Sequence, residues 1–438
     1  MKSSGRSLRP AHFAGWKREA TSSCRGHGQP RLCTGGSACS QAFPVRYSLA
    51  AGPHGVPALV LEGEERACEP EGYNRVMQST VSAKRVIFKG SVLFFVFEVL
   101  IVALPLPLGA ANAFGLMGIK RERFPVSTVP PVDDALDVGN LDAMFASHVV
   151  SDSKPANEFR VLVLGDSTIW GLQLTPEQVL PGQLNQLGLT CGERPFRFYN
   201  ISFPRSSATK DIMILNRAMK VQPDAIVWLV TWYTLMPKTR VDHWIVTQNP
   251  DEFTALAGRF DFLPRDNEAP SWWDAIFRRN RTLFRTLRYQ LYAPIQLATR
   301  QDQIAGPPQV PATELSRDEA FEGIKPPTLR RNQVSIDQVE DFHDLADGLP
   351  VLLVNEPILI MKGVPNGDVR YNSYYPRWVY DQYRAFLADA AANKHWNYLD
   401  LWDMFPAGSF ADTPLHLNPE AHRVLASRLA PEIRGMCE

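Results

Sequence analysis

Short runs of apolar residues alternate with helix-like segments along the chain from residue 158 onward. The clearest runs are apolar throughout rather than at every second position, which is the pattern of a strand buried on both faces of a parallel sheet. Strands that alternate with helices indicate an α/β fold whose sheet is covered by helices on both sides. Five strands are predicted, at residues 160–165, 196–202, 224–231, 349–355 and 396–401.

Helix signals fall between these runs. Thr175 and Asn418 each stand directly before a proline, which predicts an N-cap and a first helical turn at both places. We expect the helix after Asn418 to end near Ala430, and further helices at 210–221 and 377–393. In such sheets ligands bind beyond the carboxyl ends of the strands, so a functional site is expected at that edge.

Residues 235–348 separate the third and fourth predicted strands and are too many for a plain crossover. We interpret them as an inserted helical cap, with a helix over 272–301. That helix carries a cluster of arginines, which either face solvent or bind an anionic polymer or lipid headgroups. The arginines are Arg278, Arg279, Arg281, Arg285 and Arg288.

Residues 1–76 differ from the rest of the chain. They mix glycine, proline, serine, arginine and scattered cysteine, with neither a helical nor a strand period. They are interpreted as a disordered tail or as a stretch translated from a wrongly assigned start codon upstream of Met77.

A long apolar run covers residues 86–108, interrupted only by Lys89 and Glu98. About 20 apolar residues suffice to cross a bilayer as a helix. Basic residues precede the run, which favours an N-terminus inside the cell and the remainder of the chain outside. We therefore predict an N-terminal membrane anchor or signal region over 77–118, with Glu98 either marking a contact with another membrane protein or simply tolerated.

Two alternatives to the anchor stay open. The small residues at 111–113 fit the cleavage site of a secretory signal peptide, and a buried core helix is also conceivable if Glu98 has a partner. Residues 119–157 contain prolines and aspartates and are predicted to form a stalk, with a short helix near 141–147. The folded domain is then expected to cover 158–438.

Bulk composition excludes several classes of function. Lysine plus arginine and aspartate plus glutamate number 46 each, so no nucleic-acid partner is expected. No zinc-type spacing and no Walker-type loop occurs, so neither a metal nor another cofactor is expected. After the apolar run only Cys191 and Cys437 remain; they form a disulfide outside the cytoplasm or, as we favour, two free buried thiols.

The residues that carry chemistry follow the first predicted strand and precede the last helix. Ser167 ends a Gly-Asp-Ser sequence directly after the strand, where a sharp turn would expose its hydroxyl. His416 lies two residues before the predicted cap Asn418. Asp412, four residues before His416 on the same loop, is close enough to orient the imidazole ring.

This pairing resembles the SGNH (GDSL-like) hydrolases, and in particular their membrane-anchored envelope branch, which includes proteins that O-acetylate polysaccharides. The resemblance implies that Ser167 is the nucleophile, His416 the general base and Asp412 the orienting acid. Together with the strand pattern it predicts a flavodoxin-like three-layer sandwich with a five-stranded parallel sheet, an inserted helical cap and an N-terminal transmembrane helix.

The sequence departs from the family at the oxyanion hole. Where the family has a glycine after its second strand, this chain has Ser202 or Arg205, and its asparagine after the third strand is replaced at Tyr233. The aspartate–histidine spacing is also one residue longer. Losing one oxyanion donor costs roughly 100- to 1,000-fold in rate. We expect the Tyr233 hydroxyl, Arg205 or Asn200 to supply the missing donor, unless the domain is inactive.

Two further residues lie at the same sheet edge. Asn355 and Glu356 end the fourth predicted strand, where they would bind substrate or support His416, or merely terminate the strand. His422, inside the last predicted helix, is expected to lie on the surface without a catalytic role.

The function predicted from these features is that of an extracytoplasmic, single-pass membrane-attached serine esterase or O-acyltransferase. Its expected partners are an acylated carbohydrate of the cell envelope or another small ester, and the membrane through residues 86–108. The alternative is a catalytically degenerate binding or scaffold protein on the same fold. A lipid esterase is a third hypothesis, suggested by membrane proximity alone.

Overall fold

The computed structural model describes residues 47–51, 57–61, 82–103, 120–126, 139–237, 243–260, 272–300, 302–303 and 314–437. The chain divides into two units, Met1–Val81 and Ser82–Glu438. In the first, strands β1 (Tyr47–Ala51) and β2 (Pro57–Leu61) pair antiparallel. This pair was not predicted, because neither segment shows enough apolar periodicity to distinguish it from its surroundings.

A six-stranded sheet organises the second unit, in the order β4-β5-β3-β6-β7-β8. Five of its strands run parallel in a flavodoxin-like order, as predicted, but the sheet has six strands rather than the predicted five. The sixth, β4, pairs antiparallel with β5 and makes the sheet mixed; two residues are too few to leave a sequence signal. The strands are β3 (Phe159–Leu164), β4 (Thr190–Cys191), β5 (Arg194–Asn200), β6 (Ala225–Val230), β7 (Val351–Asn355) and β8 (Asn397–Asp400).

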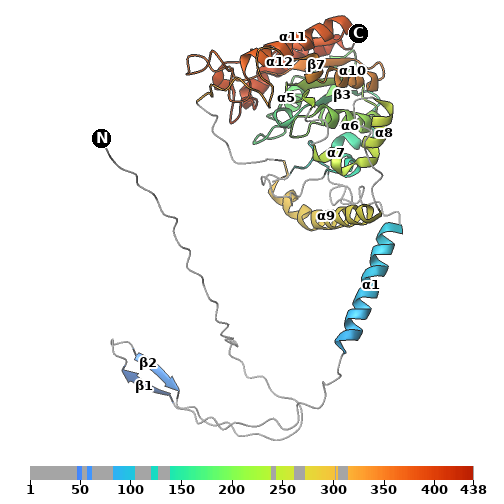
Figure 1. The fold of residues 1–438 in the computed structure, drawn as a ribbon, viewed down its shortest axis with the longest axis vertical. Coiled ribbons are helices and arrows are strands. Elements are labelled where there is room, and N and C mark those ends of the chain that lie inside the picture. The colour runs from blue at the N-terminus through green and yellow to red at the C-terminus, as the bar shows by residue number, and fades with distance from the viewer. Residues whose placement is uncertain are drawn as a thin grey trace. The chain divides into compact units, whose positions relative to one another are not determined.

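Helices cover both faces of the sheet because successive strand residues point to opposite sides. Leu162 and Leu164 of β3 enter one apolar core, and Val161 and Val163 enter the other. The first core is closed by α6 (Ala208–Ala218), α10 (Ile336–Leu345) and α11 (Arg377–Lys394). The second is closed by α5 (Leu180–Gln186) and α12 (Pro419–Gly435), which pack against each other (Figure 1).

Two helix boundaries differ from the prediction. Thr175 does not begin a helix: α5 starts at Leu180 behind Val179, and the Thr175 N–H donates to Gln178 Oε1 in a turn. The last helix does begin after its Asn418 cap but continues past Ala430, because its next turn buries Ile433 completely against the sheet.

The insertion between β6 and β7 contains α7 (Trp244–Gln248), α8 (Pro250–Arg259), α9 (Trp272–Thr299) and α10. The predicted helix at 272–301 is therefore confirmed. The interpretation of all of 235–348 as a cap is wrong for α10, because α10 packs beside α6 within the layer that covers the sheet. The remaining short helices are α3 (Leu141–Ala146), α4 (Ser167–Trp170), η2 (Val149–Ser151), η3 (Met219–Val221), η5 (Arg331–Gln333) and η6 (Ala407–Ser409).

The predicted anchor coincides in part with α1 (Ala83–Ala103), whereas residues 104–108 lie outside the described residues. Within the described ranges, no helix is both long enough and apolar enough to cross a membrane. Glu98 accepts a hydrogen bond from Asn280 Nδ2 of α9, so its partner belongs to the same chain. The predicted cleavage site at 111–113 also lies outside the described residues.

Cys191 and Cys437 form a disulfide, with their Cα atoms 5.6 Å apart. The prediction of two free thiols is thus wrong. The bond joins β4 at the edge of the sheet to the residue just beyond α12, two segments that the sequence separates by 246 positions. Spacing alone does not reveal such a pair, because the fold brings its ends together.

Candidate active site

Ser167 lies at the carboxyl edge of the sheet, three residues beyond the end of β3. Asp166 caps α4, and its Oδ1 accepts a hydrogen bond from the Thr168 N–H at 2.9 Å. The turn is sharp because the chain passes directly from the buried strand into this short helix. As a result Ser167 is partly exposed, whereas Thr168 and Ile169 are buried.

His416 and Asp412 complete a hydrogen-bonded chain with Ser167. His416 Nε2 lies 2.9 Å from Ser167 Oγ, and His416 Nδ1 lies 2.7 Å from Asp412 Oδ1. The extra residue between Asp412 and His416 is accommodated by a tight turn, in which Thr413 Oγ1 accepts a hydrogen bond from the His416 N–H at 3.0 Å. This arrangement has the geometry of a nucleophile, a base and a group that orients the base.

Asp412 has a second hydrogen-bond donor that sequence reasoning missed. Gln173 Nε2 donates to Asp412 Oδ2 at 2.8 Å. Burial raises the pKa of Asp412. The hydrogen bond from His416, the charge of His416 and the hydrogen bond from Gln173 lower it, and together they leave the pKa below its ordinary value. Asp412 is therefore held as a carboxylate beside His416. Gln173 follows α4 in a turn, with φ of 65°, and no sequence signal marked it.

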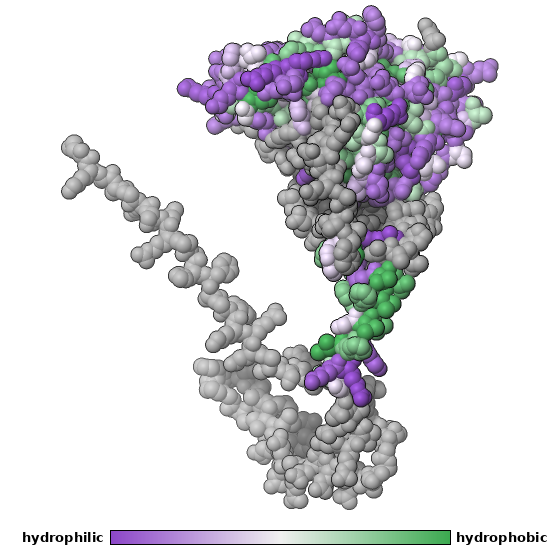
Figure 2. Space-filling model, turned by 45° about the vertical axis from the view of Figure 1, so that its right-hand side comes forward, coloured by the Kyte–Doolittle hydropathy of each residue, from purple (hydrophilic) through white to green (hydrophobic). Residues whose placement is uncertain are grey.

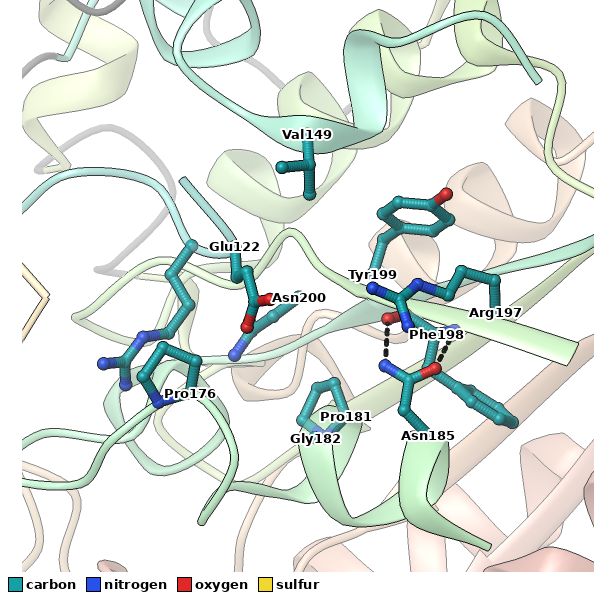
Figure 3. Close-up of a pocket in the computed structure, with 11 residues that line it drawn as sticks. Glu122, Val149, Pro176, Pro181, Gly182, Asn185, Arg197, Phe198, Tyr199 and Asn200 are labelled. Carbon is teal, nitrogen blue, oxygen red and sulfur yellow. Dashed lines mark hydrogen bonds between the residues drawn. The ribbon is translucent and has the colours of Figure 1, made fainter. Parts of the chain in front are cut away.

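Asn200, a predicted oxyanion donor, is instead hydrogen-bonded to backbone groups near the nucleophile. Its side chain is buried, donates to the Ile169 carbonyl at 2.8 Å and accepts from the Ser202 N–H at 3.2 Å. Asn200 also lines a shallow pocket between α5 and β5 (Figure 3). In that pocket the Asn185 amide exchanges two hydrogen bonds with the backbone of Phe198, each 2.9 Å long. Ser167, His416 and Asp412 do not line it.

Arg205 stands in a backbone conformation that normally favours glycine. Its φ is 68°, and its side chain is exposed. The next residue, Ser206, donates from Oγ to Asp166 Oδ2 at 2.5 Å, which holds this loop against the turn that carries the nucleophile. Of the two residues predicted to replace a glycine, Arg205 has a positive φ and Ser202 does not. Such strain in a non-glycine residue is often found at functional sites.

Lys210 links two loops beneath the site and was predicted only as a helix residue. Its ammonium group is fully buried and donates to the Gly165 carbonyl at 2.9 Å and to the Phe203 carbonyl at 2.7 Å. It also pairs with Asp211 at 3.0 Å. Burial raises the pKa of Asp211 to about 6 although the charge of Lys210 opposes it. Lys210 thus fixes the ends of the nucleophile loop and of the Arg205 loop relative to each other.

Tyr233 lies in an aromatic cluster after β6. Its ring centroid is 5.4 Å from those of Phe321 and Tyr375 and 5.8 Å from that of Tyr374. Burial raises the pKa of Tyr233 to about 12, so its hydroxyl stays protonated and can donate a hydrogen bond. Burial raises the pKa of Tyr374, and the charge of Asp412 acts in the same direction. Sequence reasoning did not single out Tyr374.

Asn355 and Glu356 are both buried at the end of β7. Asn355 donates to Asp400 Oδ1 at 2.8 Å and accepts from the Tyr383 hydroxyl at 3.1 Å, so it joins β7 to β8 and α11. Glu356 is buried, and neither of its carboxyl oxygens has a hydrogen-bond partner among the described residues. Burial raises the pKa of Glu356 well above its ordinary value, which favours the neutral form of the group.

His422 is completely buried, so the prediction that it lies on the surface is wrong. It occupies the inward face of α12, which the predicted helix did not define. Burial lowers its pKa to about 3, and the nearby charge of His416 acts in the same direction. Within the described ranges, no group of three or more histidine, cysteine, aspartate or glutamate side chains is placed to hold a metal ion.

Neither a protein-family profile nor a curated protein matches the sequence. The chain is similar in structure to SGNH/GDSL esterases and lipolytic proteins. Among them, a carbohydrate acetylesterase family member from Sinorhizobium meliloti is 13% identical, with 64% of this chain and 98% of that chain covered and a TM-score of 0.30. An aryl esterase from M. smegmatis is 10% identical, with 63% and 99% covered and a TM-score of 0.30. A lipase/acylhydrolase from Enterococcus faecalis is 13% identical, with 63% and 95% covered and a TM-score of 0.32.

Proposed function

We propose that this protein is a serine ester hydrolase or acyltransferase whose nucleophile is Ser167. The observation that supports this most directly is the unbroken hydrogen-bonded chain from Ser167 through His416 to Asp412. A buried, ionised carboxylate beside the imidazole selects the tautomer that leaves Nε2 free to accept a proton. No other group is required to activate the serine.

The reaction we propose has two steps. His416 Nε2 takes the proton of Ser167 as Oγ attacks the ester carbonyl; the carbonyl re-forms as the alcohol leaves with the proton from His416. An acyl-serine results. A second hydroxyl compound, water or an alcohol, then attacks this acyl group by the same route and restores Ser167. Asp412 stabilises the imidazolium in both steps.

The negative charge that develops on the carbonyl oxygen needs hydrogen-bond donors. We propose the backbone N–H groups of Ser167 and Arg205 for this role, with the Tyr233 hydroxyl as the third donor. The left-handed conformation of Arg205 supports its part, because it matches that of a glycine in the same loop. Asn200 is not proposed, since its amide already binds the backbone.

For the substrate we propose an acylated carbohydrate of the cell envelope, on the resemblance to the envelope branch of the family. For the location we propose the outside of the cytoplasmic membrane. The disulfide between Cys191 and Cys437 supports this location, because such bonds form and persist in oxidising compartments and are rare in the cytosol.

Labelling with a fluorophosphonate tests the proposal. The reagent should modify Ser167 covalently in the parent protein, identified by the mass of its proteolytic peptide, and should not modify Ser167→Ala. Ser427→Ala is a matched control, because Ser427 is an exposed serine on α12. Absence of labelling at Ser167, together with no turnover of any ester, would support a non-catalytic binding module instead.

A substrate panel separates the finer possibilities. Acetylated sugars and phospholipids are offered to the parent protein and to Ser167→Ala under the same conditions. Turnover of sugar esters alone would support the carbohydrate substrate, whereas turnover of phospholipids alone would replace it with a lipid esterase. A sugar without an acyl group is added to the reaction as an acceptor. Transfer would convert it into a new ester, whereas hydrolysis would leave it unchanged.

A further inference from the structure

Helix α9 presents a stripe of large apolar side chains to solvent. The stripe consists of residues three, four or seven positions apart, which share one face of a helix. Each side chain is 50% to 75% exposed. They are Trp273, Phe277, Phe284, Leu287, Leu291 and Ile295. Outside α1 and α9, the exposed large apolar side chains of the described residues are only Leu187 and Val424, so this stripe is not a general feature of the surface.

Positive charge accompanies the stripe. The sequence of α9 contains five arginines and a single acidic residue, Asp274. Of these arginines, Arg288 is exposed and directly follows Leu287 of the stripe. A helix with an apolar face that includes tryptophan and phenylalanine, and arginines next to that face, has the composition of helices that lie in the headgroup region of a bilayer.

A second apolar surface adjoins the stripe. Helix α1 packs against α9, and Asn280 Nδ2 of α9 donates a hydrogen bond to Glu98 Oε2. The large apolar side chains of α1 are exposed from Val86 to Leu100, at positions that fall all round the helix. Figure 2 shows the apolar surface of α1 on the face in view. A protein groove covers one face of a helix, whereas apolar residues all round require an apolar surrounding. Glu98, the single acidic residue of α1, is hydrogen-bonded to the neighbouring helix α9.

We propose that α9 lies in the surface of a bilayer that contains anionic lipids, with its apolar stripe toward the acyl chains. The apolar contact gives the attraction to lipid, and the excess of arginine gives the preference for anionic headgroups. Continuity with α1 favours lipid over a second copy of the chain. This inference is independent of the esterase function.

The connections of α9 would transmit such docking to the catalytic domain. Directly beyond its end, Asp302 pairs with Arg121 at 3.0 Å. Arg123 donates to the carbonyl of Gln303 and, at 2.7 Å, to the carbonyl of Trp170, the last residue of α4. Because α4 begins with Ser167, the two buried hydrogen bonds of Arg123 connect the segment after α9 to the helix that carries the nucleophile. A docked α9 would therefore hold the candidate active site near the membrane surface.

Quenching of tryptophan fluorescence by brominated lipid tests the proposal at α9 itself. The full-length variants Phe284→Trp and Val424→Trp are each reconstituted into vesicles of phosphatidylcholine with brominated phosphatidylglycerol. Both substitutions place an indole at an exposed apolar position, so Val424 on α12 is the matched control. We expect the indole added at position 284 to lose fluorescence about threefold more than the one at 424.

Each outcome decides the matter. Equal, weak quenching at both positions would overturn the proposal, and a dimeric mass in light scattering that Phe284→Gln abolishes would assign the stripe to a second copy of the chain. The quenching at position 284 should fall when brominated phosphatidylcholine is the only lipid. Unchanged quenching there would overturn the preference for anionic headgroups. Fluorophosphonate labelling of Ser167 is unaffected by all of these results.

Discussion

His416 Nε2 lies 2.9 Å from Ser167 Oγ although the two residues are 249 positions apart in the sequence. The sheet accounts for this approach. Ser167 follows β3 in the middle of the sheet, and His416 precedes α12, which packs beneath the same strand. Both loops emerge at the carboxyl edge, where parallel α/β sheets bind ligands. The hydrogen bond therefore depends on the complete fold.

Ser167→Ala should abolish ester cleavage and leave the fold unchanged. Ser167 is partly exposed in a turn, so removing its hydroxyl creates no buried cavity. We expect kcat to fall by about 1,000-fold or more, because the covalent step has no other nucleophile. Turnover of a chromogenic acetate ester and the thermal unfolding curve measure both parts. Undiminished turnover with an intact fold would refute the assignment of the nucleophile.

Tyr233→Phe should lower kcat by about 10-fold or more and leave KM largely unchanged. The raised pKa keeps the hydroxyl protonated, and phenylalanine preserves the ring contacts with Phe321 and Tyr375. Loss of the hydroxyl alone is thus tested. Kinetics equal to those of the parent would show that Tyr233 only packs in the aromatic cluster, and the donor would then be sought at Arg205 or at backbone amides.

The sequence was informative where local pattern determines structure. The buried strands β3 and β6 are apolar throughout, and their bounds were predicted to within about two residues. The triad residues could be predicted for a related reason. Ser167 directly follows a strand, and Asp412 and His416 share one short loop before a capped helix. In each case the spacing along the chain already limits the distance in space.

Residues whose roles depend on distant segments were missed. Gln173 reaches Asp412 across 239 positions, and Lys210 reaches Gly165 across 45. His422 is buried because α12 turns that face toward the sheet, and helical propensity alone does not define a face. Asn200 is polar and correctly placed at a strand end, but its partner Ile169 becomes visible only in the fold. Tertiary contacts, rather than residue type, assign these roles.

Removal of the disulfide should destabilise the catalytic domain. The double variant Cys191→Ser/Cys437→Ser frees the ends of a loop of 246 positions, and we expect the free energy of unfolding to fall by about 2–4 kcal/mol. Urea denaturation measures it. Dithiothreitol should destabilise the parent protein by a similar amount and leave the double variant unchanged. A parent protein indifferent to the reductant would contradict the prediction.

His422 should make the domain less stable in acid. Its pKa is lowered to about 3 by burial, whereas the unfolded state has a pKa of 6.5. Below pH 6.5 the unfolded state therefore binds more protons, and stability falls by up to about 1.4 kcal/mol per pH unit until pH 3 is approached. His422→Leu removes this proton uptake, so its urea midpoint should depend less on pH between 6.5 and 4.5.

The same substitution gives a second readout at neutral pH. Neither ring nitrogen of His422 has a hydrogen-bond partner among the described residues, and buried polar atoms without partners are destabilising. His422→Leu should therefore be at least as stable as the parent at pH 7.5. Parallel pH profiles for the two proteins would show that His422 does not set the acid sensitivity.

Arg205 allows the two kinds of oxyanion donor to be separated. If its backbone N–H stabilises the oxyanion, the side chain is dispensable, and Arg205→Gly should keep kcat within about twofold of the parent. Glycine adopts a φ of 68° without the steric cost that arginine bears, so the loop conformation is retained. Arg205→Ala keeps that cost but also lacks the guanidinium group, and we expect similar kinetics.

A loss of about 100-fold or more in both variants would instead identify the guanidinium as the donor. A loss in Arg205→Ala that Arg205→Gly does not share would point to the loop conformation. Steady-state kinetics of the three proteins on one acetate ester therefore distinguish backbone, side chain and loop geometry.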